Sequence, residues 1–145
     1  MQAKMLKVLV TVVIVGLMIT KMAQSEREVD GILGSKKTVR VENDLTNGIS
    51  VFLHCKSRDD DLGEHVLENG QYQEWRFRNN IAHSTLFWCA MRASNVQSSF
   101  DVYSYKADNA VCDQCNRSLR NDGLYFYNQF ENKWEKKLSW NIQAF

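Results

Sequence analysis

The chain has 145 residues and a formal net charge of +1, and 44% of its residues are hydrophobic and 11% aromatic. This apolar content is sufficient for one packed core and argues against disorder over most of the chain. Neither the total charge nor any local run supplies a basic field, which argues against a nucleic acid as partner.

The first residues have the layout of a secretory signal peptide. Lys4 and Lys7 precede an apolar run over residues 8–19. This run of about a dozen residues is shorter than the ~20 that a membrane-spanning helix needs. Because Ala23 and Ser25 are small residues at the positions that a signal peptidase reads, we predict cleavage after Ser25 and a secreted, extracellular product that has no membrane anchor.

The mature chain is then close to neutral. Three of the 18 Lys and Arg residues and none of the 17 Asp and Glu residues lie in residues 1–25, which leaves a formal charge of −2. Residues 26–37 are polar and show no sustained period, so they predict a flexible N-terminal tail. We expect the folded domain to occupy residues 38–145.

Short runs of β-branched and aromatic residues, separated by turn signals, fill the rest of the chain. These predicted strands cover residues 38–43, 49–56, 65–67, 72–77, 85–91, 99–105, 117–120, 124–129 and 134–140. No amphipathic helical stretch follows residue 25. The pattern indicates an all-β fold, a small antiparallel β-sandwich of about eight strands or a barrel-like relative of it.

Turn residues and alternation predict some of the pairing. Asn47 and Gly48 predict a hairpin between the first two strands, and residues 121–123 predict another near the end of the chain. Residues 85–91 are so apolar that we expect a central strand buried on both faces. In residues 99–105 the alternation places Tyr103 on the outward face.

Four cysteines enter an oxidising compartment if the leader directs export, and disulfides are then expected. Cys112 and Cys115 form a C-x-x-C pair, whereas Cys55 and Cys89 are isolated. A zinc site would require a second tight pair of ligands, and a redox motif would require a βαβ unit; the sequence shows neither. Because long closed loops remove more entropy from the unfolded chain, we predict the pairs Cys55 with Cys115 and Cys89 with Cys112.

Three consecutive carboxylates, Asp59, Asp60 and Asp61, precede Gly63. An EF-hand requires alternating acids and a closing glutamate, so the spacing argues against one. A solvated turn whose aspartates accept local backbone hydrogen bonds is the simpler interpretation, and a weak cation site is the alternative. We therefore assign no metal and no cofactor.

Signals for catalysis are weak. No serine lies in a G-x-S-x-G elbow, and no cysteine stays free if all four pair. His54 points outward if Cys55 points inward, and His83 lies in a polar loop, so both are interpreted as surface histidines. A triad assembled from distant strands or a glycosidase carboxylate pair leaves no mark in a sequence.

Asn116 begins the N-x-S sequence N-R-S and is a candidate glycosylation site, although it adjoins Cys115. The aromatic residues are compatible with a carbohydrate platform or a partner-binding patch, but most occupy alternating strand positions and are expected in the core. They are Trp75, Phe77, Phe87, Trp88, Phe100, Tyr125, Tyr127, Trp134 and Trp140.

Seven blocks together resemble the plant self-incompatibility protein family, also called S-protein homologues, over residues 38–140. The blocks are residues 39–43 (VRVEN), 53–63 (LHCKSRDDDLG), 75–77 (WRF), 85–89 (TLFWC), 100–103 (FDVY), 112–115 (CDQC) and 122–127 (DGLYFY). The resemblance implies a small secreted β-sandwich with two disulfides, no enzymatic activity and a role as an extracellular signal. One departure is Asn116, where the family usually has tryptophan.

The sequence therefore predicts a secreted monomer that binds a cell-surface receptor or another extracellular protein. Loops on a rigid sheet are the expected contact surface, here residues 57–63, 78–84, 93–97 and 106–113. The candidate contact residues in them are Asp59, Asp60, Asp61, Arg78, Asn79, Asn80, Asp108 and Asn109. An extracellular hydrolase or a carbohydrate-binding module of the same architecture is the alternative.

Overall fold

The computed structural model describes residues 7–21 and 34–144, and the chain divides into two units, one before and one from Lys36. Residues 7–21 form a helix in which Thr11 and Thr20 donate side-chain hydrogen bonds to the carbonyls four residues earlier. Among the described residues no helix is both long enough and apolar enough to cross a membrane. The predicted cleavage site and most of the predicted tail lie outside the described residues.

Residues 36–139 fold into nine strands and one short helix. The first strands are β1 (Lys36–Asn43), β2 (Val51–Ser57), β3 (Asp61–Leu67), β4 (Tyr72–Arg78), β5 (Leu86–Ala93) and β6 (Val96–Ser104). The helix α2 (Tyr105–Asp108) precedes β7 (Gln114–Arg120), β8 (Gly123–Asn128) and β9 (Lys133–Ser139). The short helix was not predicted, and β1 begins two residues before the predicted domain start.

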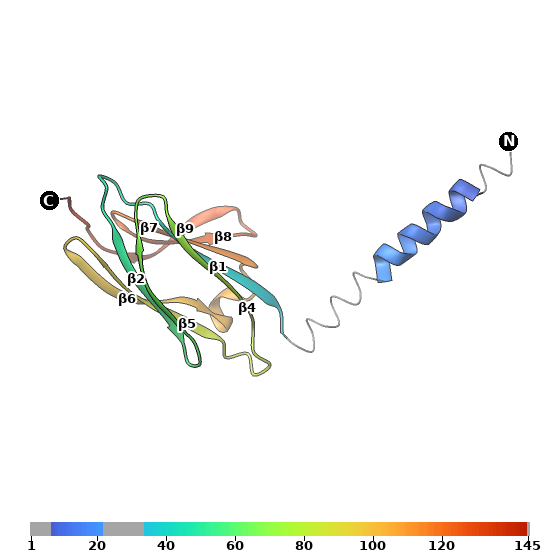
Figure 1. Ribbon diagram of the computed structural model, residues 1–145, viewed down its shortest axis with the longest axis horizontal. Coiled ribbons are helices and arrows are strands. Elements are labelled where there is room, and N and C mark those ends of the chain that lie inside the picture. Colours follow the sequence, from blue (N-terminus) through green and yellow to red (C-terminus); the bar gives the residue numbers. More distant parts are fainter. Residues whose placement is uncertain (1–6, 22–33, 145) are drawn as a thin grey trace. The chain divides into compact units, whose positions relative to one another are not determined.

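The strands form two sheets that pack as a sandwich (Figure 1). One sheet has five strands in the order β4-β1-β7-β8-β9, and the other has four in the order β3-β2-β5-β6. This confirms the predicted all-β sandwich. The sandwich is not wholly antiparallel, however, because β1 and β7 pair in parallel, with Val39 opposite Cys115.

One predicted hairpin is correct and the other is wrong. β7 and β8 pair directly across the 121–122 turn, as expected. β1 and β2 lie in different sheets, so the Asn47-Gly48 turn carries the chain across the sandwich. Both glycine and asparagine there adopt positive φ, at 68° and 59°, which is compatible with either kind of connection.

Alternating side chains from both sheets fill the core. On β5 the residues Phe87, Cys89, Met91 and Ala93 are buried, and their neighbours are not. The expectation that this strand is buried on both faces is therefore wrong; it is central in its sheet but one face is open to solvent.

Tyr103 is buried rather than outward-facing, with 0% of its surface exposed. The pairing of β5 with β6 slips by one residue, since Phe87 lies opposite Tyr103 and Trp88 lies opposite Asp101. This bulge turns Val102 and Tyr103 both toward the core. Simple alternation along the strand therefore fails at this point.

The aromatic residues divide between the core and the surface. Phe77 is partly buried and packs against the core, with its ring centroid 4.7 Å from that of Phe87 and 4.9 Å from that of Tyr103. Trp134, by contrast, is 40% exposed. It contacts Tyr127 on the outer face of the five-stranded sheet, at a centroid distance of 5.1 Å.

All four cysteines are in disulfides, but the predicted pairing is wrong. Cys55 pairs with Cys89, and Cys112 pairs with Cys115. Cys55 and Cys89 lie directly opposite each other on β2 and β5, with Cα atoms 4.0 Å apart. The entropy of the unfolded chain sets how much a given disulfide stabilises the fold. It does not select the pairing, because the folded strands decide which sulfur atoms lie close enough to bond.

Candidate functional site

Strand direction assigns every connection to one of two ends of the sandwich. The connections at residues 58–60, 79–85, 105–113 and 129–132 lie at one end, which we call the loop end. Those at 44–50, 68–71, 94–95 and 121–122 lie at the opposite end, as does the chain after Ser139.

Three of the four predicted binding loops are therefore neighbours at the loop end, and the fourth is not. The fourth connection, between β5 and β6, packs against the C-terminal segment. Asn95 Nδ2 donates to the Asn141 carbonyl at 3.0 Å, and the Gln143 amide donates to Asn95 Oδ1 at 3.0 Å. Residues 93–97 therefore lie at the end opposite to the other three predicted binding loops.

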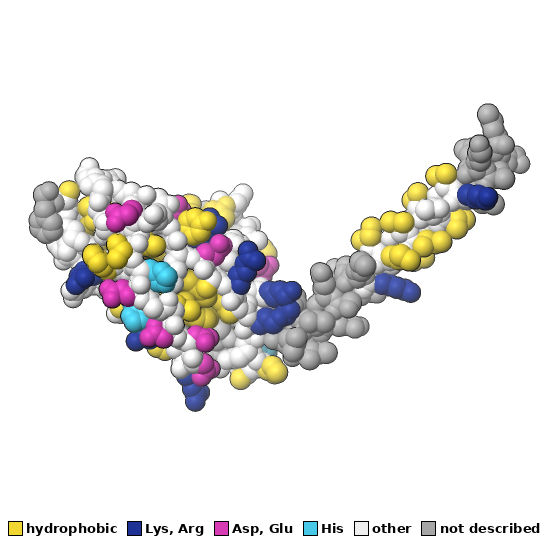
Figure 2. Space-filling model, viewed as in Figure 1, with side chains coloured by type: hydrophobic (Ala, Val, Ile, Leu, Met, Phe, Trp, Pro, Cys, Tyr) yellow, Lys and Arg dark blue, Asp and Glu magenta, His cyan; other side chains and the backbone are white. Residues whose placement is uncertain are grey.

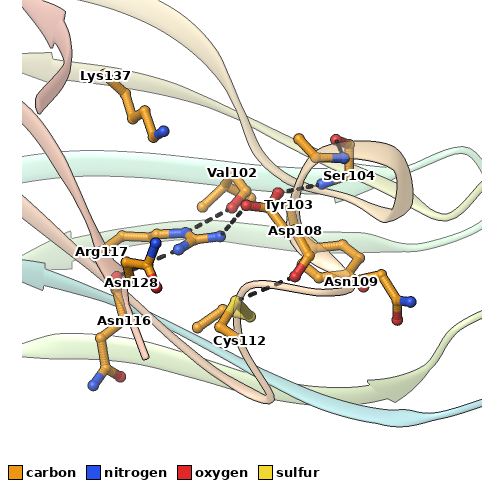
Figure 3. Close-up of polar contacts among 12 residues, drawn as sticks. Val102, Tyr103, Ser104, Asp108, Asn109, Cys112, Asn116, Arg117, Asn128 and Lys137 are labelled. Carbon is orange, nitrogen blue, oxygen red and sulfur yellow. Dashed lines mark hydrogen bonds and ion pairs between the residues drawn. A yellow bond between two sulfur atoms is a disulfide. The ribbon is translucent and has the colours of Figure 1, made fainter. Parts of the chain in front are cut away.

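A buried ion pair fixes α2 against the core of the loop end (Figure 3). Arg117 points inward from β7 with its side chain 0% exposed, and its Nη2 lies 3.1 Å from Asp108 Oδ1. Its Nε donates to the Val102 carbonyl at 2.9 Å. The second carboxylate oxygen of Asp108 accepts from the Ser104 amide at 2.8 Å. The pair joins β7, β6 and α2.

Burial dominates the protonation of this arginine. Desolvation lowers the pKa of Arg117 to about 10, and the Asp108 carboxylate opposes that shift. The guanidinium therefore remains charged at neutral pH. The Phe126 ring covers it, with Arg117 Cζ 3.6 Å from the ring centroid.

A second buried chain of hydrogen bonds joins the β4–β5 loop to the residue after α2. Tyr103 donates its hydroxyl to Asn79 Oδ1 at 2.7 Å, and Asn79 Nδ2 donates to Asn109 Oδ1 at 2.9 Å. Burial raises the pKa of Tyr103 to about 12, so the phenol stays protonated as a donor at neutral pH.

Lys37 fastens the start of β1 to the same loop. Its side chain is 2% exposed, and its Nζ contacts the Asp113 carboxylate at 2.8 Å. The same nitrogen donates to the carbonyls of Asn109 and Cys112, each at 2.8 Å. A buried ammonium with three acceptors is fully satisfied.

Two of the eight predicted contact residues therefore have a different role. Asn79 is 1% exposed and Asp108 is 6% exposed, so neither presents a surface to a partner. Asn109 is half-buried between Asn79 and Lys37. These three hold the loops in place, and the sequence could not distinguish that role because polar residues in a loop are usually exposed.

Four other predicted residues meet around one hollow. Asp59, Asp60, Arg78 and Asn80 line a cavity of about 430 Å³ between the β2–β3 and β4–β5 connections. The remaining lining is formed by Ser57, Arg58, Phe77, Ser84, Thr85, Leu86, Phe87 and Trp88. We call this cavity the loop-end hollow. It combines charged groups of both signs with an apolar and aromatic floor.

Asp61 lies outside the hollow, at the first position of β3. Its Oδ1 contacts His54 Nε2 at 2.5 Å on the outer face of the four-stranded sheet. This hydrogen bond lowers the pKa of Asp61, with a smaller contribution from the Gly63 amide. His54 thus points outward, as predicted. The acidic run is therefore split between two surfaces.

The β4–β5 loop has a defined shape. Asn80 Oδ1 accepts from the Ser84 amide at 2.8 Å, and Thr85 Oγ1 accepts from the Asn80 amide at 2.7 Å. His83 adopts a φ of 58° and stacks on Tyr105 with a centroid distance of 4.5 Å. The loop presents Ile81, which is 75% exposed. In the sequence, the only sign of this exposed residue is that it is the one large apolar residue of the segment N-N-I-A-H-S.

Asn116 lies on β7, pointing to the outer face of the five-stranded sheet, and is half-buried. Its Oδ1 accepts from Gln114 Nε2 at 2.9 Å. Its glycosylation stays a prediction. Within residues 7–21 and 34–144 no three His, Cys, Asp or Glu side chains gather as a metal site.

The surface shown in Figure 2 has no single-sign field. Acidic and basic side chains intermingle there with hydrophobic ones over the sandwich. A mixed surface of this kind favours a protein partner with complementary charges over a polyanion.

The geometry agrees with comparisons to known proteins. The family model described as plant self-incompatibility protein S1 matches residues 38–140. This chain belongs to that family. The family member is 32% identical to S-protein homolog 24 of Arabidopsis thaliana, over 83% of this chain and 80% of the relative. It is 33% identical to self-incompatibility protein S1 of Papaver rhoeas, over 67% of this chain and 72% of the relative.

A solved structure supports the fold of this family member. It is described as one of the SPH (Self-Incompatibility Protein Homologue) proteins, a widespread family of small, highly stable, secreted proteins from plants. The TM-score is 0.51 at 16% identity, over 75% of this chain and 93% of the other. The chain thus belongs to a family of small secreted plant proteins that includes a self-incompatibility protein.

Proposed function

We propose that this protein is an extracellular ligand that binds a cell-surface receptor through the loop-end hollow. In this proposal the signal peptide is removed after Ser25, the residues before Lys36 form a flexible tail, and the domain that begins at Lys36 acts as a monomer. It acts by binding rather than by catalytic turnover. The receptor is a protein, because the hollow offers both apolar floor and charges of both signs.

The observation that carries this proposal is the loop-end hollow on a rigid frame. Leu86 is 37% exposed and lines the hollow with the carboxylates of the β2–β3 connection, and Ile81 is 75% exposed on the β4–β5 connection. Apolar anchors surrounded by charged groups are typical of protein interfaces, where the anchors supply affinity and the charges supply orientation and association rate. Because buried side chains hold the loops, little conformational entropy is lost on binding.

The test is a charge reversal at the rim of the hollow. We expect D59K/D60K to weaken saturable binding of the labelled protein to protoplasts of the source plant by about ten-fold or more, since each lost charge contact costs order 1 kcal/mol. E64K/E68K is the matched control, because Glu64 and Glu68 are exposed residues that do not line the hollow.

Unchanged circular dichroism and unfolding for both variants would show that the fold is intact. Equal loss of binding in the two variants would contradict the proposal, because net charge alone would then explain the effect. A second test is I81E, which replaces the exposed apolar residue of the β4–β5 connection, and we expect it to abolish binding without altering the free energy of unfolding. Sedimentation equilibrium tests the proposed monomeric state, and we expect the mass of a single chain.

A further inference from the structure

A second cavity, of about 480 Å³, lies between the two sheets at the margin formed by β6 and by β8 and β9. β6 and β9 are the outer strands of their sheets, so no further strand closes the sandwich there. The apolar lining is formed by Phe100, Val111, Leu124, Phe126 and Leu138. We call this cavity the inter-sheet cavity. Its volume falls within the range of small-molecule sites.

The polar group at its inner wall is the buried Arg117. Its side chain is 0% exposed, and Nη2 has no hydrogen-bond partner of good geometry although it lies 3.1 Å from Asp108 Oδ1. A guanidinium carries five N–H donors; here Nε donates to the Val102 carbonyl at 2.9 Å and Nη1 donates to the Asn116 carbonyl at 3.5 Å, while Nη2 has only the ion-pair contact with Asp108. The cavity therefore meets a buried cation with unused donor capacity.

The entrance carries a second set of polar groups. Asn128 Nδ2 donates to Glu135 Oε1 at 2.9 Å, and Lys137 Nζ lies 3.8 Å from Glu135 Oε2. Lys137, Asn128 and Arg117 all line the inter-sheet cavity, and Figure 3 labels the three side chains. The Arg117 and Lys137 charges are each matched by one carboxylate, and Asp101 adds a third carboxylate to the lining, so the inter-sheet cavity has a formal charge of −1.

We propose that the inter-sheet cavity binds a small, mainly apolar molecule whose carbonyl or carboxylate oxygen accepts a hydrogen bond from Arg117. The apolar walls favour a hydrocarbon body, and an acceptor oxygen satisfies the donor that the protein leaves unmatched. To reach that donor, the half-buried Phe126 ring moves off the guanidinium. This site is separate from the loop-end hollow, because the two cavities share no lining residue.

The test is a titration of the disulfide-bonded protein followed by ¹H–¹⁵N NMR. The probes are octanoate for a carboxylate, 2-nonanone for an uncharged carbonyl, and octylammonium as a cation without an acceptor. We expect saturable shifts of the Arg117 Nε–H and of the Leu124 and Phe126 amides with octanoate, 2-nonanone or both. If octanoate binds more tightly than 2-nonanone, the preferred acceptor is a carboxylate; the reverse order identifies an uncharged carbonyl.

Two variants make the result specific to the inter-sheet cavity. L138W fills it from its exposed edge and should weaken binding at least ten-fold, whereas V66W, on the outer face of β3, should leave it unchanged. R117K keeps the positive charge but removes the planar guanidinium donors, and its affinity for the probe that binds should also fall at least ten-fold. If R117K does not fold, the affinity of L138W for the probe tests the proposal by itself.

Absence of saturable shifts would overturn this assignment. So would equal shifts with octylammonium, or binding that L138W leaves intact. None of these results bears on the receptor proposal, which is tested at other residues.

Discussion

The two ends of the sandwich are built from different chemistry. Ionised side chains organise the loop end, where Lys37, Asp108 and Arg117 are buried and paired. Neutral amides organise the opposite end, whereas at the loop end the Asn79–Asn109 amide pair accompanies the buried charges. At the opposite end Asn43 is 0% exposed, and its Nδ2 donates to the carbonyls of Ile49 and Leu67 at 2.9 and 2.8 Å.

The amide network of the opposite end continues through the other connections. Asn43 Oδ1 accepts from the Leu45 amide at 3.0 Å, and Asn121 Oδ1 accepts from the Thr46 amide at 3.0 Å. Asn69 Nδ2 donates to the Leu45 carbonyl at 3.0 Å. An amide satisfies backbone groups without a buried charge, so this end avoids the desolvation cost that the loop end carries.

The use of buried charges at one end and neutral amides at the other predicts how the stability of each end responds to substitution. A charge pair that loses one member leaves an uncompensated buried charge, which costs more than a lost neutral hydrogen bond. The loop end should therefore be more sensitive to substitution and to pH than the opposite end. Its loops are the proposed contact surface, so rigidity there has a direct functional use.

The largest effect is expected for R117M. Asp108 would then remain buried without its cation, and we expect the free energy of unfolding to fall by about 3–5 kcal/mol. Urea denaturation at pH 7 measures it. The double variant D108L/R117M should lose less than R117M alone, because no charge is left unpaired. A double-variant loss equal to the sum of both single losses would contradict a coupled pair.

Among the other substitutions of buried polar side chains, the largest effect is expected for N43A at the opposite end. Removal of the Asn43 side-chain amide leaves the Leu67 carbonyl and the Leu45 amide without their side-chain partner. We expect the free energy of unfolding to fall by about 3 kcal/mol. Because the amide does not ionise, the loss should be the same at pH 6 and pH 9. A loss that changes between those values would show that the neutral network is coupled to a titrating group.

A pH-dependent effect is expected at Tyr103. Its folded pKa of about 12 exceeds the ordinary 10.0, so the folded state retains this proton after the unfolded state has released its own. The contribution is fully present below pH 10 and is lost as pH rises toward 12, up to about 3 kcal/mol. The wild-type minus Y103F difference in unfolding free energy should fall over this range. A constant difference would contradict it.

The smallest of these effects is expected for the local disulfide of the loop end. Cys112 and Cys115 are three residues apart, whereas Cys55 and Cys89 are 34 apart. In the chain-entropy model, C112S/C115S should cost about 2 kcal/mol and C55S/C89S about 4 kcal/mol. Thermal unfolding of both variants measures the order. A larger loss for C112S/C115S would mean that the turn before β7 depends on its cross-link.

Local pattern was sufficient for the strands but not for their partners. The β7–β8 hairpin follows from its N-D-G turn, and Gly123 is also required there because a Cβ atom would lie 2.1 Å from the Leu138 carbonyl oxygen. The Asn47-Gly48 turn has an equally strong signal, yet it joins different sheets. Turn residues specify a bend in the backbone, and long-range packing specifies which strands it joins.

The same limit applied to the candidate site. Asp59, Asp60, Arg78 and Asn80 were predicted as loop residues and do line the loop-end hollow. Asn79, the immediate neighbour of two of them, is buried as a hydrogen-bond partner of Tyr103. Adjacent polar residues in one loop cannot be told apart by composition, because their roles depend on side chains from other strands.

The amino-acid sequence by itself determined the class of this protein: short alternating runs require strands with one buried face, and the spaced blocks over residues 38–140 specify the family. The tertiary structure alone decided the parallel β1–β7 pairing, the cysteine partners and the separation of scaffold from surface at the loop end. The physical reason is the separation in sequence between the residues that interact. Alternation is set by neighbouring residues, whereas a disulfide, an ion pair or a hollow forms between residues that only the packed sheets bring together.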